Sequence, residues 1–144
     1  MSGKITVIAA ESDVHFEAAR YLCSDWVNWQ LKVFPEKKDI ILSVFDPIEY
    51  AKTLENLPSI HARPKGAIIL ASLDSDYVGC VMYQEMAPKL AEVKRLFVAE
   101  SGRGHGVGHI LLTEMFRHMK NDGYERTQFS SARFLTHARD LYEK

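Results

Sequence analysis

The order of apolar and polar residues along the chain predicts an alternation of strands and helices. A short apolar run over residues 5–9 is typical of a strand. Over residues 13–32, apolar positions recur at three- and four-residue spacing, which indicates a long amphipathic helix. Ser12 or Asp13 offers the N-cap of that helix. The chain is therefore expected to begin with a strand and a helix.

Three aromatic residues, Trp26, Trp29 and Phe34, lie on or just beyond this helix. They could stack on a ligand. Aromatic residues at helical spacing more often pack in a core, however, so we assign them to the core.

A second helix start lies at residues 46–49, which read Asp-Pro-Ile-Glu. Aspartate suits the N-cap, proline the first helical position and glutamate the third. This helix should run to about Asn56. Residues 34–38 break the helical pattern before it, and residues 57–64 form a proline-containing connector after it.

From residue 66 the pattern changes to that of strands. Residues 67–71 are almost continuously apolar, residues 74–76 have turn chemistry, and residues 77–83 are again rich in strand-forming side chains. These features predict a hairpin. Residues 91–98 alternate charged and apolar side chains and should add a third antiparallel strand.

Residues 106–120 carry an apolar stripe and end before Gly123, which suits a helix C-cap. A short strand over 127–129 and an incomplete helix over 134–142 complete the series. The order β, α, α, β, β, β, α, β, α predicts a mixed α/β fold. The central sheet should be mostly antiparallel and flanked by helices, in a single domain over residues 1–144.

Composition narrows the classes of function. The 144 residues are 47% hydrophobic, which supports one real core, and the net charge of −1 gives no basic field for nucleic acid. Cys23 and Cys80 are far apart in sequence and are expected to be free thiols in a reducing compartment. Without a signal peptide or a membrane span in the sequence, we expect a cytoplasmic protein with no membrane partner.

The most informative stretch is the glycine-rich segment from Gly102 to Gly108, which follows the strand at 91–98 and opens the helix at 106–120. Glycines at alternate positions let backbone N–H groups turn toward a ligand phosphate. Neither register of G-x-G-x-x-G fits, because Val107 or His109 occupies the third glycine position. The lysine of a P-loop is also missing. The spacing that fits is R-x-x-G-x-G, read from Arg103.

That segment resembles the pyrophosphate-binding loop of the GNAT family of N-acetyltransferases. Similarity extends to residues 92–98 before the loop, to Gly123-Tyr124, and to residues 138–144 at the chain end. It covers residues 66–144 well and the whole chain more loosely. The resemblance implies a GNAT-like fold and an acetyl-CoA-dependent N-acetyltransferase, in which an amine attacks the thioester directly in a ternary complex.

The resemblance also implies which residues bind coenzyme A. The strand end should pair with the pantetheine arm and polarise the acetyl carbonyl through a backbone N–H. The loop and the helix N-terminus should hold the pyrophosphate. The expected cofactor-binding residues are Leu96, Phe97, Val98, Arg103, Gly104, His105, Gly106, Val107 and Gly108.

Two residues match catalytic positions of such enzymes. Glu92 matches a general base that accepts the amine proton, and Tyr142 matches the tyrosine that protonates the leaving thiolate. A glutamate paired with Lys94 and a tyrosine packed against the sheet are the structural alternatives. The histidines at 105, 109, 118 and 137 are too dispersed to predict a metal site.

The chain ends before the Gly-Phe pair and the last two strands that family members usually have. We expect either a shortened chain or a reduced member, and the strand near Thr127 would then be an open edge that invites dimer pairing. The acceptor is expected to be a small amine or an amino acid. The alternatives are a non-catalytic acyl-CoA-binding or interaction domain and another binder of nucleotide phosphate.

Overall fold

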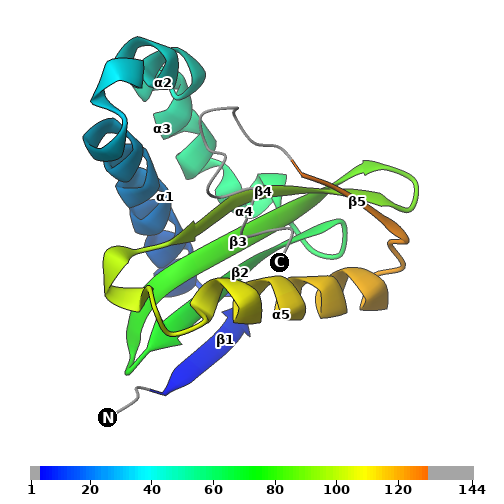
Figure 1. The fold of residues 1–144 in the computed structure, drawn as a ribbon. Coiled ribbons are helices and arrows are strands. Elements are labelled where there is room, and N and C mark those ends of the chain that lie inside the picture. Colours follow the sequence, from blue (N-terminus) through cyan, green and yellow to red (C-terminus); the bar gives the residue numbers. More distant parts are fainter. Residues whose placement is uncertain (1–3, 130–144) are drawn as a thin grey trace.

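The computed structural model describes residues 4–129 and contains one five-stranded sheet with helices on both faces (Figure 1). The strands lie in the order β1-β2-β3-β4-β5. Neighbours are antiparallel except for β4 and β5, which are parallel. The strands are β1 (Ile5–Ala9), β2 (Gly66–Leu73), β3 (Asp76–Ala87), β4 (Leu90–Val98) and β5 (Arg126–Phe129). The predicted mixed fold with a mostly antiparallel sheet is confirmed.

The helices fall into two groups. Helix α5 crosses one face of the sheet, and the segment between β1 and β2 covers the other face and rises beyond its edge (Figure 1). That segment contains α1 (Asp13–Val33), α2 (Lys38–Val44), α3 (Pro47–Glu55) and α4 (Leu57–Ile60). Helix α5 spans Val107–Asn121, and short 3-10 turns occur at Pro35–Lys37 (η1) and Glu100–Gly102 (η2).

Local signals at the helix ends explain why they form where they do. The Ser12 hydroxyl accepts from the N–H of His15, whose Nδ1 accepts from the N–H of Ser12, which is a capping box. The Asp46 carboxylate accepts from the N–H groups of Ile48 and Glu49, as the sequence predicted. Gly123 follows the C-cap of α5 and has φ of 91°, a left-handed conformation that suits glycine at the end of a helix.

Besides the predicted α3, the chain between α1 and β2 contains helical segments that the sequence pattern did not predict. The segment after Val33 contains η1 and α2, where only a break in the pattern was expected, and α4 lies within the expected connector. Helix α2 has a single buried residue, Ile41, so it lacks the apolar stripe that identified α1. The predicted helix over 134–142 lies outside the described residues.

Each face of the sheet has its own core. On the α5 face, residues including Val107, Leu111 and Met115 pack against alternate residues of β2, β3 and β4, such as Ile69, Val81 and Val93. On the α1 face the buried residues are Ala19, Leu22, Cys23, Leu57, Ile68, Leu70, Cys80, Met82 and Phe97. The period of two along each strand divides its side chains between the two cores.

Strand β4 departs from this period at a bulge. Cys80 pairs with Phe97 and Met82 with Lys94, so one residue of β3 lies opposite two residues of β4. Arg95 occupies the bulge with φ of 56°. Its carbonyl oxygen accepts from the Cys80 thiol at 3.4 Å.

A hydrogen-bonded network fixes the connector before β2 to the end of α5. The Arg63 guanidinium donates to both carboxylate oxygens of Asp122, at 2.6 Å from Nη2 to Oδ1, and the Tyr83 hydroxyl donates to the same carboxylate. The Asp122 side chain is only 7% exposed. Its burial opposes ionisation, but the hydrogen bonds from Arg63 and Tyr83 outweigh that effect and lower the pKa of Asp122.

Asp122→Asn is expected to destabilise the protein by roughly 1–3 kcal/mol, because Arg63 and Tyr83 lose a charged acceptor. The stabilisation from Asp122 is complete above its unfolded pKa of about 4 and is lost as pH falls through its lower folded pKa. Urea unfolding of both proteins between pH 7 and pH 3 measures the loss at each pH. The difference should shrink toward acid pH.

The matched control is Glu49→Gln, which removes the exposed Lys52–Glu49 pair on α3. A solvated pair of this kind contributes about 0.5 kcal/mol or less. Equal losses in the two variants would show that the Arg63–Asp122 network has no special role in stability.

Candidate functional site

A cavity of about 330 Å³ lies between α1, the end of β4 and the start of α5. Its volume falls in the range of small-molecule sites, about 300–1,000 Å³. Eight of the nine residues that the sequence assigned to cofactor binding line it: Leu96, Phe97, Val98, Arg103, Gly104, Gly106, Val107 and Gly108. The remaining one, His105, is exposed and does not line this cavity.

The glycines of the loop have different structural roles. Gly102 is buried in η2, where a Cβ would lie 2.8 Å from the side chain of Val78. Gly104 and Gly106 have φ of 82° and 75°, and a Cβ at either would meet nothing within 4 Å. Gly108 is buried in α5. Only Gly104 and Gly106 are therefore conformational glycines that leave open space beside the loop.

The N-terminus of α5 faces this cavity through Val107 and Gly108. Its N-cap is Gly106, which has no side chain to satisfy the N–H groups of the first turn. Those N–H groups and the helix dipole make the end of α5 suitable for a phosphate group. The first turn also contains no acidic residue that would repel an anion.

Arg103 lies across the side of the cavity. Its Nε donates to the carbonyl oxygen of Val98 at 3.0 Å, and its guanidinium carbon lies 4.7 Å from the ring centre of Trp29. The guanidinium is therefore held by a hydrogen bond and a cation–π contact while it stays exposed. If the Arg103 side chain moves away from the Trp29 ring, its guanidinium is free to contact an anionic ligand.

The two tryptophans pack in the core, as predicted, and have a second role. Trp26 and Trp29 pack against the core on the α1 face, but both are only partly buried and both line the cavity. His109, in the first turn of α5, also lines it. Helical spacing could not reveal this double role, because it does not show that the apolar stripe of α1 extends past the sheet to the cavity.

Beyond Val93, the outer edge of β4 has no strand partner among residues 4–129. Strand β5 pairs only with Leu90 to Val93, in parallel register. The backbone from Lys94 to Val98 lies next to the cavity, which Leu96, Phe97 and Val98 line. Unpaired backbone groups along such an edge are suited to hydrogen bonds with an extended ligand.

Glu92 lies on β4 with a side chain that is 12% exposed. Its Oε1 is 3.6 Å from the ammonium group of Lys94 and accepts from the Gln84 amide at 3.4 Å. The predicted alternative, a contact with Lys94, is thus present. Tyr142, the other predicted catalytic residue, lies outside the described residues.

A polar cluster that sequence reasoning missed lies under α1 and α4. His61 is buried, its Nδ1 is 2.8 Å from the carbonyl oxygen of Tyr83, and its Nε2 is 2.9 Å from Nη1 of Arg95. Burial lowers the pKa of His61 to about 4, so the ring is neutral near pH 7. Nδ1 then donates to Tyr83 and Nε2 accepts from Arg95.

Cys23 and Cys80 are free, as predicted, but they lie together in the core beside this cluster. A hydrogen bond with Cys23, together with burial, raises the pKa of the Cys80 thiol. Their 57-residue separation in sequence gave no sign of this contact, because it depends on α1 crossing β3.

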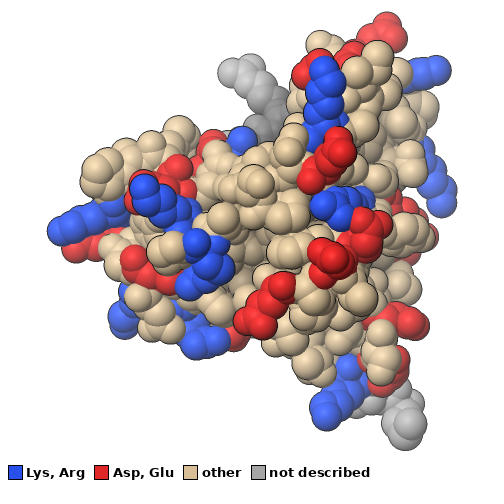
Figure 2. Space-filling view, turned by 180° about the vertical axis from the view of Figure 1, so that it is seen from behind, with Lys and Arg blue, Asp and Glu red and all other residues tan. Residues whose placement is uncertain are grey.

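Charges are mixed over the surface. Acidic and basic side chains are interspersed on the face shown in Figure 2. Within residues 4–129, no three His, Cys, Asp or Glu side chains are grouped as metal ligands. No helix in that part of the chain is long and apolar enough to cross a membrane.

One comparison with known proteins identifies a family. The family model for the acetyltransferase (GNAT) family matches residues 24–144. No functionally curated protein matches the chain in sequence.

Similar solved structures include a GNAT-family acetyltransferase from Staphylococcus aureus Mu50, with a TM-score of 0.72 and 16% identity over 97% of this chain and 81% of that one. An acetyltransferase from Streptococcus agalactiae 2603 has a TM-score of 0.72 and 15% identity, over 96% and 80%. The PaiA N-acetyltransferase from Thermoplasma acidophilum, solved with coenzyme A, has a TM-score of 0.71 and 17% identity, over 97% and 87%. These likenesses support the fold.

The predicted family is thereby confirmed. The match covers most of the chain, and the cavity lies where β4 meets the glycine loop and α5. The chain belongs to the GNAT family of acetyltransferases.

Proposed function

We propose that this chain transfers an acetyl group from acetyl-CoA to the primary amine of a small molecule or amino acid. The observation that carries the proposal is the cavity bounded by the β4 edge, two left-handed glycines and the uncapped N-terminus of α5. This combination offers backbone donors to both an extended arm and a pyrophosphate. A related structure, the PaiA N-acetyltransferase, was solved with coenzyme A.

The residues of this chain divide the binding of acetyl-CoA between them. Leu96, Phe97 and Val98 would hold the pantetheine arm along the β4 edge. The N–H groups of Gly106 to Gly108 would receive the pyrophosphate, with Arg103 as an added cation.

In the reaction, the amine nitrogen forms a bond to the acetyl carbon while the bond from that carbon to sulfur breaks. Glu92 is proposed to accept the proton that the amine loses, directly or through water. A backbone N–H of β4 stabilises the charge on the carbonyl oxygen. By resemblance alone, Tyr142 is proposed to return a proton to the thiolate of coenzyme A.

Gly106→Ala is expected to weaken acetyl-CoA binding by about tenfold or more, because a Cβ would enter the open space beside the loop at φ of 75°. It should also cost about 1 kcal/mol of stability, since alanine disfavours a positive φ. Calorimetric titration with acetyl-CoA measures the affinity, with ATP and NAD as comparison ligands.

Gly123→Ala is the matched control, because Gly123 also has a positive φ and no atom within 4 Å of a built Cβ, but lies at the other end of α5. It should lose similar stability and keep full affinity. Equal affinity losses in both variants would remove the loop from the binding site. Tighter binding of ATP or NAD than of acetyl-CoA would contradict the assigned ligand.

Glu92→Gln is expected to lower kcat by about 10²- to 10⁴-fold and leave the affinity for acetyl-CoA unchanged, since the amide cannot accept a proton. The defect should shrink as pH rises, because more of the amine is already deprotonated. Thiol release with an accepted amine, followed from pH 6 to pH 10, measures both effects.

Glu85→Gln on β3 is the matched control, because that carboxylate contacts Lys65 and Tyr124, and Tyr124 packs against the core on the α5 face. It should retain kcat. Unchanged turnover in Glu92→Gln would exclude Glu92 as the base. A wild-type protein that binds acetyl-CoA yet acetylates no amine across a broad panel would instead be a non-catalytic binding domain.

A further inference from the structure

The bulge in β4 places two cationic residues in succession on one face of the sheet. Val93 and Leu96 both pack in the core on the α5 face, although they are three residues apart. Lys94 pairs with Met82, which packs on the α1 face. Arg95 contacts His61, which follows α4 on that same face. Lys94 and Arg95 therefore both face the helical segment between β1 and β2.

These two cations have different partners. Lys94 lies 3.6 Å from the Glu92 carboxylate. None of the ion pairs found within residues 4–129 includes Arg95, whose side chain instead donates to the neutral ring of His61. The part of the chain that the structure describes thus leaves the charge of Arg95 without a counterion.

This arrangement is costly for folding. A partly buried guanidinium loses hydration that a neutral imidazole only partly replaces. A positive φ at a long, non-glycine side chain adds a cost on the order of 1 kcal/mol. Strained, unpaired charges of this kind occur where a ligand supplies the missing partner.

The contact with His61 also orients the guanidinium. His61 is itself fixed by its hydrogen bond to the Tyr83 carbonyl, so Nη1 of Arg95 is held at one position. The edge formed by Nε and Nη2 keeps two parallel N–H donors. That fork matches the two oxygens of one carboxylate.

Arg95 also occupies a suitable place relative to the proposed reaction. It is adjacent in sequence to Leu96, which lines the donor cavity, and it faces the same side of the sheet as Glu92. An acceptor held at Arg95 would therefore lie beside both the proposed base and the β4 edge.

We propose that Arg95 binds a carboxylate group of the acceptor, so that the substrates of this enzyme are amino acids or other amines that carry a carboxylate. The assignment rests on the proposed acetyltransferase function. His61 is a positioning residue, which acts through Arg95.

The test compares wild-type kcat/KM for matched pairs of amino acids and their carboxamides, with thiol release as the readout. Glycine and glycinamide, and the same pair for several larger side chains, differ in the anionic group and in the pKa of the amine, which is lower in the amide. The values of kcat/KM are therefore compared per deprotonated amine. The carboxylates should be preferred by about 10- to 100-fold, because a bidentate charged contact is lost in the amides. Equal rates, or faster rates with the amides, would overturn the proposal.

Arg95→Gln should lower kcat/KM about 10- to 100-fold for the carboxylates and leave the amides nearly unchanged, which brings the ratio close to one. Arg95→Lys should retain part of the preference, because it keeps the charge but loses the fork. His61→Gln should raise KM for the carboxylates more than it lowers kcat. A uniform loss for acids and amides in Arg95→Gln would assign Arg95 a structural role instead.

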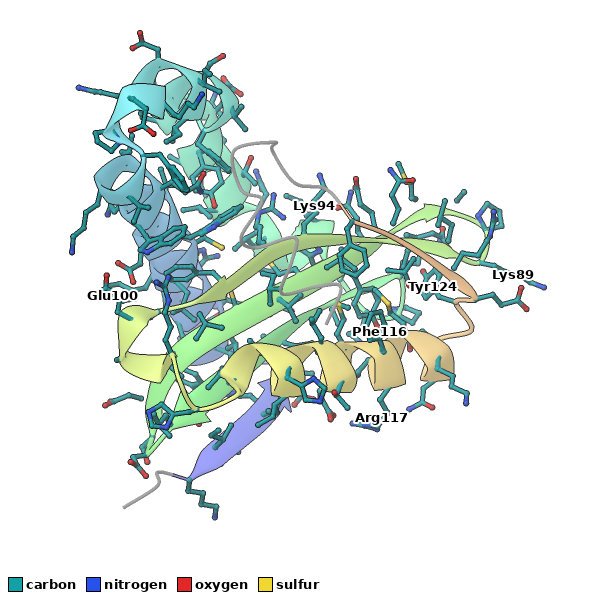
Figure 3. All side chains as sticks on the ribbon, in the orientation of Figure 1. Lys89, Lys94, Glu100, Phe116, Arg117 and Tyr124 are labelled. Atoms are coloured by element: carbon teal, nitrogen blue, oxygen red, sulfur yellow. The ribbon has the colours of Figure 1, made fainter. Side chains whose placement is uncertain are left out.

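Arg117→Gln is the matched control for charge. Arg117 is an exposed cation on α5, on the other side of the sheet from Lys94 (Figure 3). Its replacement should leave the ratio of kcat/KM for carboxylates to that for carboxamides unchanged. If Arg95→Gln does not fold, Arg95→Lys and His61→Gln test the role of Arg95, and an unchanged carboxylate preference in both variants would overturn it.

Acetylation of phosphoethanolamine tests whether the site binds any anion or carboxylates in particular. Faster acetylation of phosphoethanolamine than of the amino acids would contradict the carboxylate assignment.

Acetylation of polyamines and aminoglycosides distinguishes failure of this inference from failure of the proposed function. Acetylation of those amines without any carboxylate preference would leave the enzyme an N-acetyltransferase and refute the role of Arg95. No acetylation of any amine would refute the proposed function itself.

Discussion

The bulge at Arg95 determines how the rest of β4 is used. A single extra residue between the pairs Met82–Lys94 and Cys80–Phe97 shifts the alternation of the strand by one position. If the extra residue were absent, the side chains beyond it would exchange faces. Leu96 would leave the core on the α5 face, and Phe97 would leave the core on the α1 face. Both the donor cavity and the packing of the two helical layers depend on this local irregularity.

The fold separates the two halves of the proposed reaction into different parts of the chain. The donor side consists mainly of the end of β4, the glycine loop and the start of α5, which are continuous in sequence, and Trp26 and Trp29 of α1 complete its lining. His61, which follows α4, lies beside Arg95 on the α1 face of the sheet. The two parts therefore meet at β4. The contact from His61 to Arg95 joins them.

Much of this organisation was predictable from sequence. The capping signals at Ser12 and Asp46, the turn at Asp74 and the apolar stripe of α5 act within a few residues, so local patterns revealed them. The family resemblance, which the loop spacing revealed, also identified eight of the twelve residues that line the cavity.

The features that could not be predicted from the sequence depend on contacts between distant segments. Sequence could not distinguish Gly102, which is small because Val78 packs against it, from Gly106, which needs a positive φ. It placed Trp29 in the core, because the cavity beside that core exists only once α1 lies over β4. In the sequence, Arg95 is one charged residue in a strand whose charged and apolar residues alternate. Only the register with β3 shows that a bulge interrupts this alternation at Arg95.

The position of the tryptophans has a practical consequence. The chain contains two tryptophans, and both line the donor cavity. The guanidinium of Arg103 lies over the indole of Trp29. The tryptophan fluorescence of the unmodified protein therefore originates at this one site, and a ligand that moves Arg103 changes the surroundings of the emitting ring. If the cavity binds acetyl-CoA as proposed, the protein carries its own optical reporter of donor occupancy, without any introduced label.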